Sequence, residues 1–327
     1  MRDAFATELT NLSKERGDIV LLSGDIGNRM FDNFKKVSPN KFFNCGIAEA
    51  NMMSMAAGMA LSGLKPFVYT ITPFTTTRCL EQIRIGVAYH EAPVTIVGTG
   101  SGLSYAELGP THHSLEDIAI IRSIPGIRVL APSDRNELIS QLQDCVKNPC
   151  PTYIRIGKKG EPEIFNNDEH ELGIAKANIL KEGSDILLLG IGPIINEGLK
   201  AANELMNDNV SVSVASLGSV RPLDEKFLEI IKVPIEIGDT VLGGKFKNKK
   251  MVVKSIEKNE KGDITINKKP LLKFRITKQT ESRTKKQKPL SSVDAYKQVR
   301  KPVMPKSRPM KNKKAYDRKD LKKGKYD

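Results

Sequence analysis

Apolar and polar positions alternate in two distinct ways along residues 1–150. Short continuous apolar runs, such as residues 19–23, are typical of strands buried on both faces of a parallel sheet. Between these runs, apolar residues recur three and four positions apart, which predicts helices. The expected strands are 19–23, 66–71, 93–98 and 128–131, and the expected helices are 3–16, 78–90, 114–122 and 134–147. Strands that alternate with helices indicate an α/β fold whose parallel sheet is covered on both faces.

Two of these helices carry a capping signal at their start. Asp134 with Glu137, and Ser114 with Asp117, have the spacing of a capping box, in which the first side chain binds the backbone three residues later. We therefore expect one helix to begin at Asp134 and another at Ser114.

A further helix is expected at residues 46–58, where small and apolar residues surround a single acid, Glu49. Apolar positions 47, 48, 52, 55, 56 and 59 have helical spacing, and the small residues let a second backbone approach closely. This pattern predicts a buried helix at an interface. Glu49 lies near the helix start, where the helix dipole favours a negative charge, and its apolar surroundings favour a bound proton. It is therefore either a proton donor and acceptor or a helix-capping glutamate.

Candidate chemistry gathers in the segments that follow the expected strands. Ligands of parallel sheets bind at the carboxyl ends of strands, and Phe74 and residues 99–113 follow two of these ends. The segment 99–113 is rich in glycine and too long for a simple connection, and His112 and His113 lie at its end. Paired histidines in such a place favour a functional role over a purely structural one.

Several blocks of residues, in order and at matching spacing, resemble the pyrimidine-binding domain of transketolases. They are G-I-A-E at 46–49, A-A-G-M-A at 56–60, Phe74, L-G-P-T-H-H-S-L-E-D-I-A at 108–119 and R-S-I-P-G-I-R-V-L-A-P-S-D at 122–134. The chain is most similar to the split transketolases, whose two halves are separate chains. The resemblance implies that residues 1–157 form a domain that binds the pyrimidine of thiamine diphosphate.

The resemblance also implies roles for particular residues. Glu49 matches the glutamate that hydrogen-bonds and activates the cofactor, Phe74 matches the aromatic residue that stacks on the pyrimidine, and Ile47 is expected beside them. His112, with His113 beside it, matches a ligand of substrate oxygens, and Arg155 matches an arginine that binds the phosphate of the acceptor. For Arg155, a structural charge at a strand end is an equal alternative. Many transketolases carry an acid directly before G-P-T-H where this chain has Leu108, so the identity of the sugar substrate is left open.

The family's diphosphate and magnesium motif, G-D-G followed by paired asparagines, is not completed by Gly24-Asp25 or Gly238-Asp239. The resemblance therefore implies that an amino-terminal partner subunit supplies most of the magnesium and diphosphate site. A homodimer of heterodimers is expected, with sugar phosphates as substrates.

A second alternation of strands and helices follows a polar link. Expected strands at 175–180, 185–190 and 210–215, a helix at 194–206 and the segment V-R-P-L-D at 220–224 resemble the first part of the transketolase carboxyl-terminal domain. We assign residues 158–232 to a truncated form of that domain, because the resemblance ends near Ile231.

The net charge of +14 is unevenly distributed. Residues 1–232 hold 23 basic and 28 acidic side chains, whereas residues 233–327 hold 29 and 10. Short alternating stretches at 233–278 predict a small SH3-like β segment, and the lysine-rich residues 279–327 are expected to be disordered. Nucleic acid binding is possible through residues 279–327 only, although few aromatic residues are interleaved with the charges.

These features predict a thiamine-diphosphate-dependent enzyme that transfers a two-carbon ketol unit between sugar phosphates. The alternatives are an enzyme like 1-deoxy-D-xylulose-5-phosphate synthase, one like the β subunit of a 2-oxoacid dehydrogenase, and a non-catalytic fusion whose basic end binds nucleic acid. The four cysteines and four histidines have no metal-ligand spacing. We expect no membrane span and a cytoplasmic location, since no apolar run is long enough to cross a bilayer.

Overall fold

The computed structural model describes residues 1–27, 29–165, 170–230, 237–238, 240–243, 249–258, 264–270 and 275–276. The chain divides into two compact units, Met1–Val233 and Pro234–Asp327, which are described separately. Among the described residues, no helix is long and apolar enough to cross a membrane.

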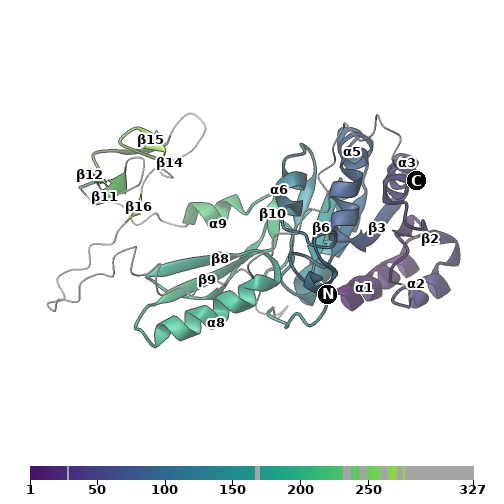
Figure 1. Cartoon of the computed structure of the whole chain (residues 1–327), viewed down its shortest axis with the longest axis horizontal. Coiled ribbons are helices and arrows are strands. Elements are labelled where there is room, and N and C mark those ends of the chain that lie inside the picture. Colours follow the sequence, from purple (N-terminus) through teal and green to yellow (C-terminus); the bar gives the residue numbers. More distant parts are fainter. Residues whose placement is uncertain are drawn as a thin grey trace, which may run out of the picture. The chain divides into compact units, whose positions relative to one another are not determined.

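A seven-stranded sheet forms the centre of the first unit, with strand order β10-β5-β6-β4-β3-β1-β2 (Figure 1). Its strands are β1 (Ile19–Ser23), β2 (Phe42–Asn44), β3 (Lys65–Ile71), β4 (Thr95–Thr99), β5 (Arg128–Leu130), β6 (Thr152–Ile156) and β10 (Ser219–Arg221). Neighbouring strands pair in parallel, except that β10 runs antiparallel to β5. The predicted α/β fold is confirmed, while the short strands β2 and β10 were not predicted.

Helices cover both faces of this sheet. They are α1 (Arg2–Glu15), α2 (Asp32–Val37), α3 (Glu49–Leu61), α4 (Thr72–Thr75), α5 (Leu80–Gln82), α6 (Asp117–Arg122) and α7 (Arg135–Lys147), with a π-helical segment η3 (Ile83–Tyr89) and short 3-10 turns η1 (Pro39–Lys41), η2 (Thr77–Cys79) and η4 (Ala106–Leu108). One core, which includes Met52 and Ile83, lies under α3 and η3, and the other, which includes Phe5 and Leu138, lies under α1 and α7.

The helix predicted at 78–90 is divided among η2, α5 and η3. Its second half packs tightly on α3, because a Cβ atom added to Gly86 would lie 3.4 Å from the Ala57 side chain. Helix α3 buries Met52, Met53, Ala56, Ala57 and Ala60, whereas Ile47 and Met55 of the predicted face are exposed. The periodicity did not identify the buried face, because this helix is apolar on most of its sides.

One of the two capping predictions is confirmed in part and the other is wrong. The Asp134 side chain accepts hydrogen bonds from the backbone of Asn136 and Glu137, so α7 begins as predicted. The Glu137 carboxylate, however, accepts from the backbone of Ser133 instead of closing the box on Asp134. Helix α6 begins at Asp117 and not near Ser114, because the Asp117 side chain is bound by tertiary partners.

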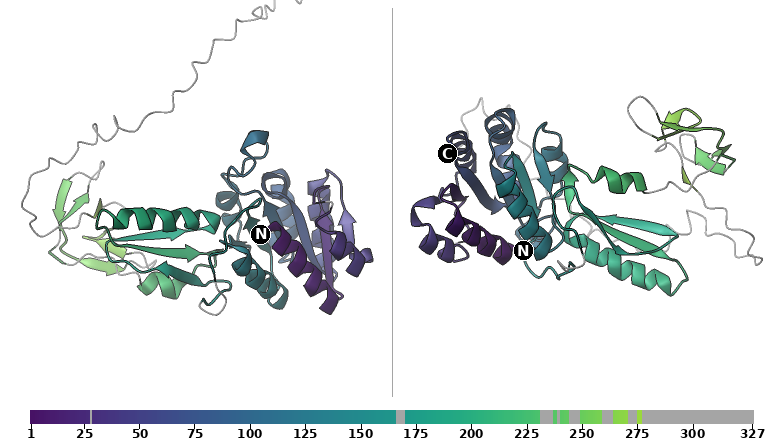
Figure 2. Two further views of the ribbon diagram at one scale, coloured as in Figure 1. Left: turned by 90° about the horizontal axis from the view of Figure 1, so that it is seen from below. Right: turned by 180° about the vertical axis from the view of Figure 1, so that it is seen from behind.

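A second sheet in the first unit has strand order β7-β9-β8, with β7 (Ala177–Lys181), β8 (Ile186–Gly190) and β9 (Val212–Leu217). After the 3-10 turn η5 (Gly192–Ile194), α8 (Ile195–Met206) packs along one face of it (Figure 2). Strand β9 leads directly into β10 of the large sheet, which joins the two regions, and α9 (Glu225–Ile230) follows. The alternation predicted for 158–232 is therefore present in its described part.

The described residues of the second unit form two antiparallel sheets of three short strands each, β12-β11-β16 and β13-β14-β15. Their bounds are β11 (Thr240–Gly243), β12 (Lys249–Val252), β13 (Ile256–Lys258), β14 (Ile264–Ile266), β15 (Lys269–Pro270) and β16 (Arg275–Ile276). The expected β structure is present, and closure into an SH3-like barrel stays a prediction. The predicted disordered tail, 279–327, lies outside the described residues.

Candidate functional site

Glu49 is the first residue of α3 and is buried, with 2% of its side chain exposed. Its carboxylate accepts two hydrogen bonds from Arg78 Nη1, each 2.9 Å long. A negative charge is favoured at a helix start, and the guanidinium supplies an opposite charge. Glu49 does not act as an N-cap, since that position is Ala48, so the helix-capping alternative is not what the structure contains.

Phe74 contacts the same arginine, and His112 in turn contacts Phe74. The Arg78 guanidinium carbon is 3.9 Å from the centroid of the Phe74 ring, the geometry of a cation–π contact. The His112 ring meets Phe74 edge-on, with centroids 5.1 Å apart. Three residues predicted from separate sequence blocks are thus brought together, with Arg78 between Glu49 and Phe74.

The segment between β4 and α6 holds the two histidines in different ways. Thr111 Oγ1 lies 3.0 Å from His112 Nδ1, and His113 Nε2 lies 3.3 Å from the backbone oxygen of Ala106. Both histidines therefore contact their own loop, and His112 also faces Phe74. The loop is tied to the sheet through Lys158, which binds Glu107.

Arg155, on β6, is part of a buried polar network. Its Nε donates to Asp117 Oδ2 at 2.8 Å, and its Nη2 donates to the backbone oxygen of Ser114 at 3.2 Å. The Tyr153 hydroxyl donates to the same Asp117 oxygen at 2.6 Å, and burial raises the pKa of Tyr153 well above its usual value, so it stays a donor. Of the two alternatives for Arg155, this network gives it a structural role without excluding contact with a substrate.

A bound aminopyrimidine needs polar partners as well as an aromatic surface, and the surroundings of Glu49 offer both. Thr70 Oγ1 is buried without a hydrogen-bond partner. A Cβ atom added to Gly24 would lie 3.1 Å from Thr70 Oγ1 and 3.5 Å from Glu49 Cγ, so glycine keeps this place open. The residues therefore fit a small polar ring that contacts Glu49, although Ile47 is 80% exposed and does not line a closed cavity in this chain.

Sequence analysis missed Arg78 as a site residue. The available signal was its position four residues after Phe74, the distance of one helical turn.

Cys79, the residue after Arg78, is inert, because burial raises the pKa of its thiol to about 12. In the described part of the chain, no group of three or more histidines, cysteines or carboxylates could hold a metal ion.

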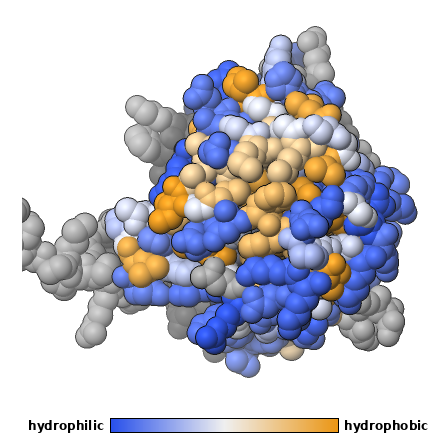
Figure 3. Space-filling view, turned by 90° about the vertical axis from the view of Figure 1, so that its right-hand side faces the viewer, coloured by the Kyte–Doolittle hydropathy of each residue, from blue (hydrophilic) through white to orange (hydrophobic). Residues whose placement is uncertain are grey.

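Apolar side chains gather on and around the exposed side of α3 (Figure 3). Those that are exposed on α3, just before it and on η3 are Ile47, Met55, Leu61, Ile85 and Tyr89. We call this set the α3 surface. Contiguous exposed apolar residues of this kind mark interaction sites more often than free surface.

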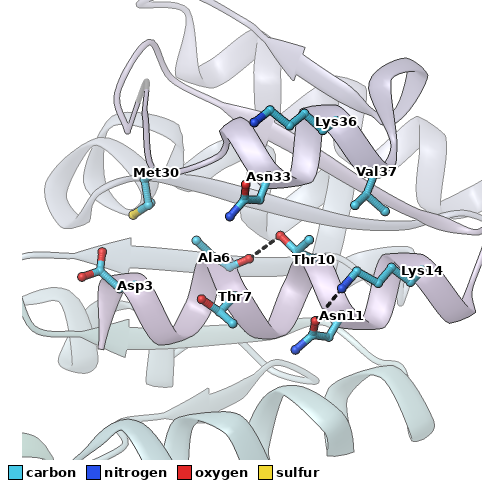
Figure 4. Close-up of a pocket in the computed structure, with 10 residues that line it drawn as sticks. All are labelled: Asp3, Ala6, Thr7, Thr10, Asn11, Lys14, Met30, Asn33, Lys36 and Val37. Atoms are coloured by element: carbon cyan, nitrogen blue, oxygen red, sulfur yellow. Dashed lines mark hydrogen bonds between the residues drawn. The ribbon is translucent and has the colours of Figure 1, made fainter.

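A groove of about 450 Å³ between α1 and α2 lies apart from these residues (Figure 4). It is lined by Asp3, Ala6, Thr7, Thr10, Asn11, Lys14, Met30, Asn33, Lys36 and Val37. Lys14 donates to Asn11 and Thr10 donates to the Ala6 backbone, so these polar groups are satisfied by the groove's own helix. None of the predicted site residues lines this groove.

Comparison with known proteins gives consistent matches over both parts of the first unit. The transketolase pyrimidine-binding domain model matches residues 1–161, and the transketolase carboxyl-terminal domain model matches residues 175–234. One of the subunits of the apulose-4-phosphate transketolase of Phocaeicola vulgatus is 34% identical over 68% of this chain and 72% of its own length. A putative transketolase C-terminal section of Methanocaldococcus jannaschii is 32% identical over 75% and 78%.

Solved structures agree with these relatives. A chain described as split gene transketolase, inactive beta4 tetramer, is 31% identical and superimposes with a TM-score of 0.64, covering 70% of this chain and 74% of that one. Transketolase from Campylobacter jejuni, 24% identical with a TM-score of 0.59, covers 69% of this chain and 36% of its own, and it supports the fold alone. From these matches, the chain belongs to the transketolase family.

Proposed function

We propose that this chain is the carboxyl-terminal subunit of a split transketolase, which uses thiamine diphosphate to transfer a two-carbon ketol unit between sugar phosphates. The observation that carries the proposal is Glu49, a buried carboxylate at the start of α3 within the part matched by the pyrimidine-binding domain model. Phe74 and His112, grouped beside it, support the same assignment.

In this proposal Glu49, Phe74 and Ile47 hold the aminopyrimidine end of the cofactor. Bound thiamine diphosphate supplies the nucleophilic carbon that side chains lack. Glu49 Oε1 or Oε2 exchanges a proton with the aminopyrimidine, and the buried position keeps water away from that proton. The Phe74 ring offers an aromatic face, and Thr70 Oγ1 offers an unpaired polar atom beside Glu49.

His112, His113 and Arg155 are proposed to bind the substrate. His112 packs against Phe74, so its imidazole lies beside the proposed cofactor residues, where it can bind a sugar hydroxyl. Arg155 suits an anionic group because its guanidinium presents a fork of donors. Related proteins are named for apulose-4-phosphate and for 6-deoxy-6-sulfo-D-fructose, two different sugars that each carry an anionic substituent. These names support a sugar with an anionic substituent as the substrate, but they do not identify which sugar it is.

A partner chain is proposed to complete the enzyme, as an amino-terminal subunit that carries the diphosphate and magnesium site. Three observations support it. Related chains are named as one of the subunits of a transketolase or as its C-terminal section, and the matched split-gene structure is described as an inactive beta4 tetramer. In addition, the α3 surface is apolar and exposed. A homodimer of heterodimers would cover the α3 surface on both copies.

The alternative enzymes fit less well. Proteins named 1-deoxy-D-xylulose-5-phosphate synthase are 32–34% identical, but the chain spans only 35–40% of their length. A β subunit of a 2-oxoacid dehydrogenase stays an alternative on domain type alone. We therefore keep ketol transfer as the proposed reaction.

A second candidate function, binding of a polyanion such as nucleic acid, is favoured by the charge of residues 233–327. Exposed lysines in the described part of that unit include Lys249, Lys250, Lys254, Lys268 and Lys269. Phosphate contacts through lysine would be independent of sequence and weakened by salt. A chain that lacks residues 233–327 should then elute from a phosphate polyanion column at lower salt than the full chain. Equal elution would remove this function.

The test of the proposed reaction is Glu49→Gln in the enzyme assembled from both subunits. Glutamine keeps the size and one acceptor but cannot exchange the proton, so we expect ketol transfer to fall ~10²- to 10⁴-fold. Glu81→Gln, the same change at an exposed acid on α5, serves as the control. A near-normal rate in Glu49→Gln would contradict the catalytic role, and full turnover by this chain alone would contradict the need for a partner.

A further inference from the structure

Arg78 makes, at the same time, the two contacts that the proposed function gives to the aminopyrimidine. Its Nη1 donates to both oxygens of Glu49 at 2.9 Å, and its guanidinium lies over the Phe74 ring, 3.9 Å from the centroid. A guanidinium and an aminopyrimidine are both flat, carry N–H donors and stack on aromatic faces. One therefore imitates the other toward these two residues.

We propose that Arg78 and the aminopyrimidine of the cofactor compete for Glu49 and for the face of Phe74. Arg78 then serves as a positioning residue that neutralises Glu49 until the cofactor enters, and it leaves these contacts when the cofactor binds. This inference rests on the proposed function, because it needs an aminopyrimidine at this place.

The difference in exposure between the two partners says which of them moves. Glu49 is buried at the start of α3 and is packed beside Thr70 and Gly24, so its position is fixed. Arg78 is 41% exposed and lies in the short 3-10 turn η2, so its long side chain can swing toward water and stay hydrated. The mobile partner in the exchange is therefore Arg78.

Physical chemistry explains why such a residue would be kept. A buried carboxylate without a counter-ion is unfavourable, because it loses its water and gains nothing in return. Arg78 removes this cost before the cofactor is present. The aminopyrimidine would remove it afterwards by carrying a proton on the ring nitrogen that faces Glu49 and donating it to the carboxylate. The consequence is that the measured affinity for an aminopyrimidine is reduced by the fraction of chains in which Arg78 still occupies Glu49.

Arg78→Gln separates the two roles that this arginine could have. A competitor that is removed no longer has to be displaced, so binding should tighten by about tenfold or more, the worth of one charge-assisted contact. A residue that holds the cofactor would instead weaken binding when removed. Arg84→Gln is the matched control, because Arg84 is an exposed arginine on η3, six residues further along the chain.

The experiment titrates the full chain with 4-amino-5-hydroxymethyl-2-methylpyrimidine, which does not need the partner's diphosphate site, and measures binding by calorimetry. We expect Arg78→Gln to bind this probe at least about tenfold more tightly than wild type, with Arg84→Gln unchanged. Equal, weaker or absent binding by Arg78→Gln overturns the proposal.

A second measurement needs no variant that could fail to fold. The side-chain Nε–H resonance of Arg78 in the wild-type chain should shift as the probe saturates the site, and a resonance that stays in place overturns the proposal. The ketol transfer assay of the assembled wild-type enzyme tests the proposed function separately. If the wild-type enzyme transfers ketol units normally but Arg78→Gln shows no gain in affinity for the probe, only the proposed role of Arg78 is contradicted. If the wild-type enzyme shows no ketol transfer, the proposed function itself is contradicted.

Discussion

Glu137 should make the stability of the first unit depend on pH in a way that a single substitution abolishes. This carboxyl group lies in α7 with 1% of its surface exposed, close to the segment that joins β9 to β10. Burial, together with the nearby Asp134 charge, raises its pKa from the ordinary 4.5 to about 7, although the Ser133 backbone N–H opposes the rise. In the unfolded chain the same group ionises near its ordinary value.

The sign and size of the effect follow from this difference. Between about pH 4.5 and pH 7 the folded chain keeps a proton on Glu137 that the unfolded chain has released, so stability falls as the pH rises through this range. The difference between the two pKa values corresponds to a loss of about 3 kcal/mol in the free energy of unfolding, since one pKa unit is worth about 1.36 kcal/mol. The loss is complete once the pH exceeds the pKa of the folded chain.

Glu137→Gln keeps the shape and can still accept from Ser133, but it cannot ionise. The free energy of unfolding of both chains should be measured by denaturant titration from pH 5 to pH 8. Between pH 5 and pH 8, we expect the free energy of unfolding of the variant to rise relative to that of the wild type by about 2 to 3 kcal/mol. All other ionisable groups are the same in both chains, so their contributions cancel in the difference. Parallel curves for the two chains would refute the buried, proton-retaining state of Glu137.

Two further predictions use the same unit. Gly218→Ala should lower the free energy of unfolding by about 1 to 3 kcal/mol in a denaturant titration, because its Cβ would overlap the Glu137 carboxylate; Gly58→Ala in α3, with nothing within 4 Å, is the control and should lose no stability. Limited proteolysis of the chain alone should cut within residues 158–230 before 1–156, because β8 leaves Ile186, Leu187 and Leu189 exposed. Equal resistance of the two regions would contradict this.

Periodicity predicted the fold well where an element had one clear environment. Residues 19–22 are apolar and, with Ser23, form a strand buried at every position, as expected of a central parallel strand. The pattern failed where tertiary contacts decide the local structure. Ser114 and Asp117 have capping spacing, but Asp117 instead binds Tyr153 and Arg155, which are 36 and 38 residues away in the sequence. No local pattern contains that information.

The candidate site was predictable only in part, for a similar reason. Glu49, Phe74 and His112 were found through sequence blocks that resemble a family, and the structure links them in a chain of contacts in which Arg78 joins Glu49 to Phe74 and Phe74 meets His112. Apart from its spacing from Phe74, nothing in the sequence marks Arg78 as a site residue, and its role is indicated by the two contacts that it makes at once. The roles of those first three residues, like those of His113, Arg155 and Ile47, stay predictions, since each depends on groups that this chain does not contain.

Helix α3 connects the proposed chemistry to the proposed assembly. A helix that is apolar on nearly all sides is normally buried on all sides, yet α3 is covered by its own chain on one face only. Its uncovered face is part of the α3 surface, which also includes Ile47, two residues before Glu49. A partner that covers this face would exclude water beside Glu49 and would raise the cost of an unpaired carboxylate there. Assembly should therefore disfavour the state in which Glu49 has lost Arg78 and not yet gained the cofactor, so that the exchange of one partner for the other becomes more nearly all-or-none.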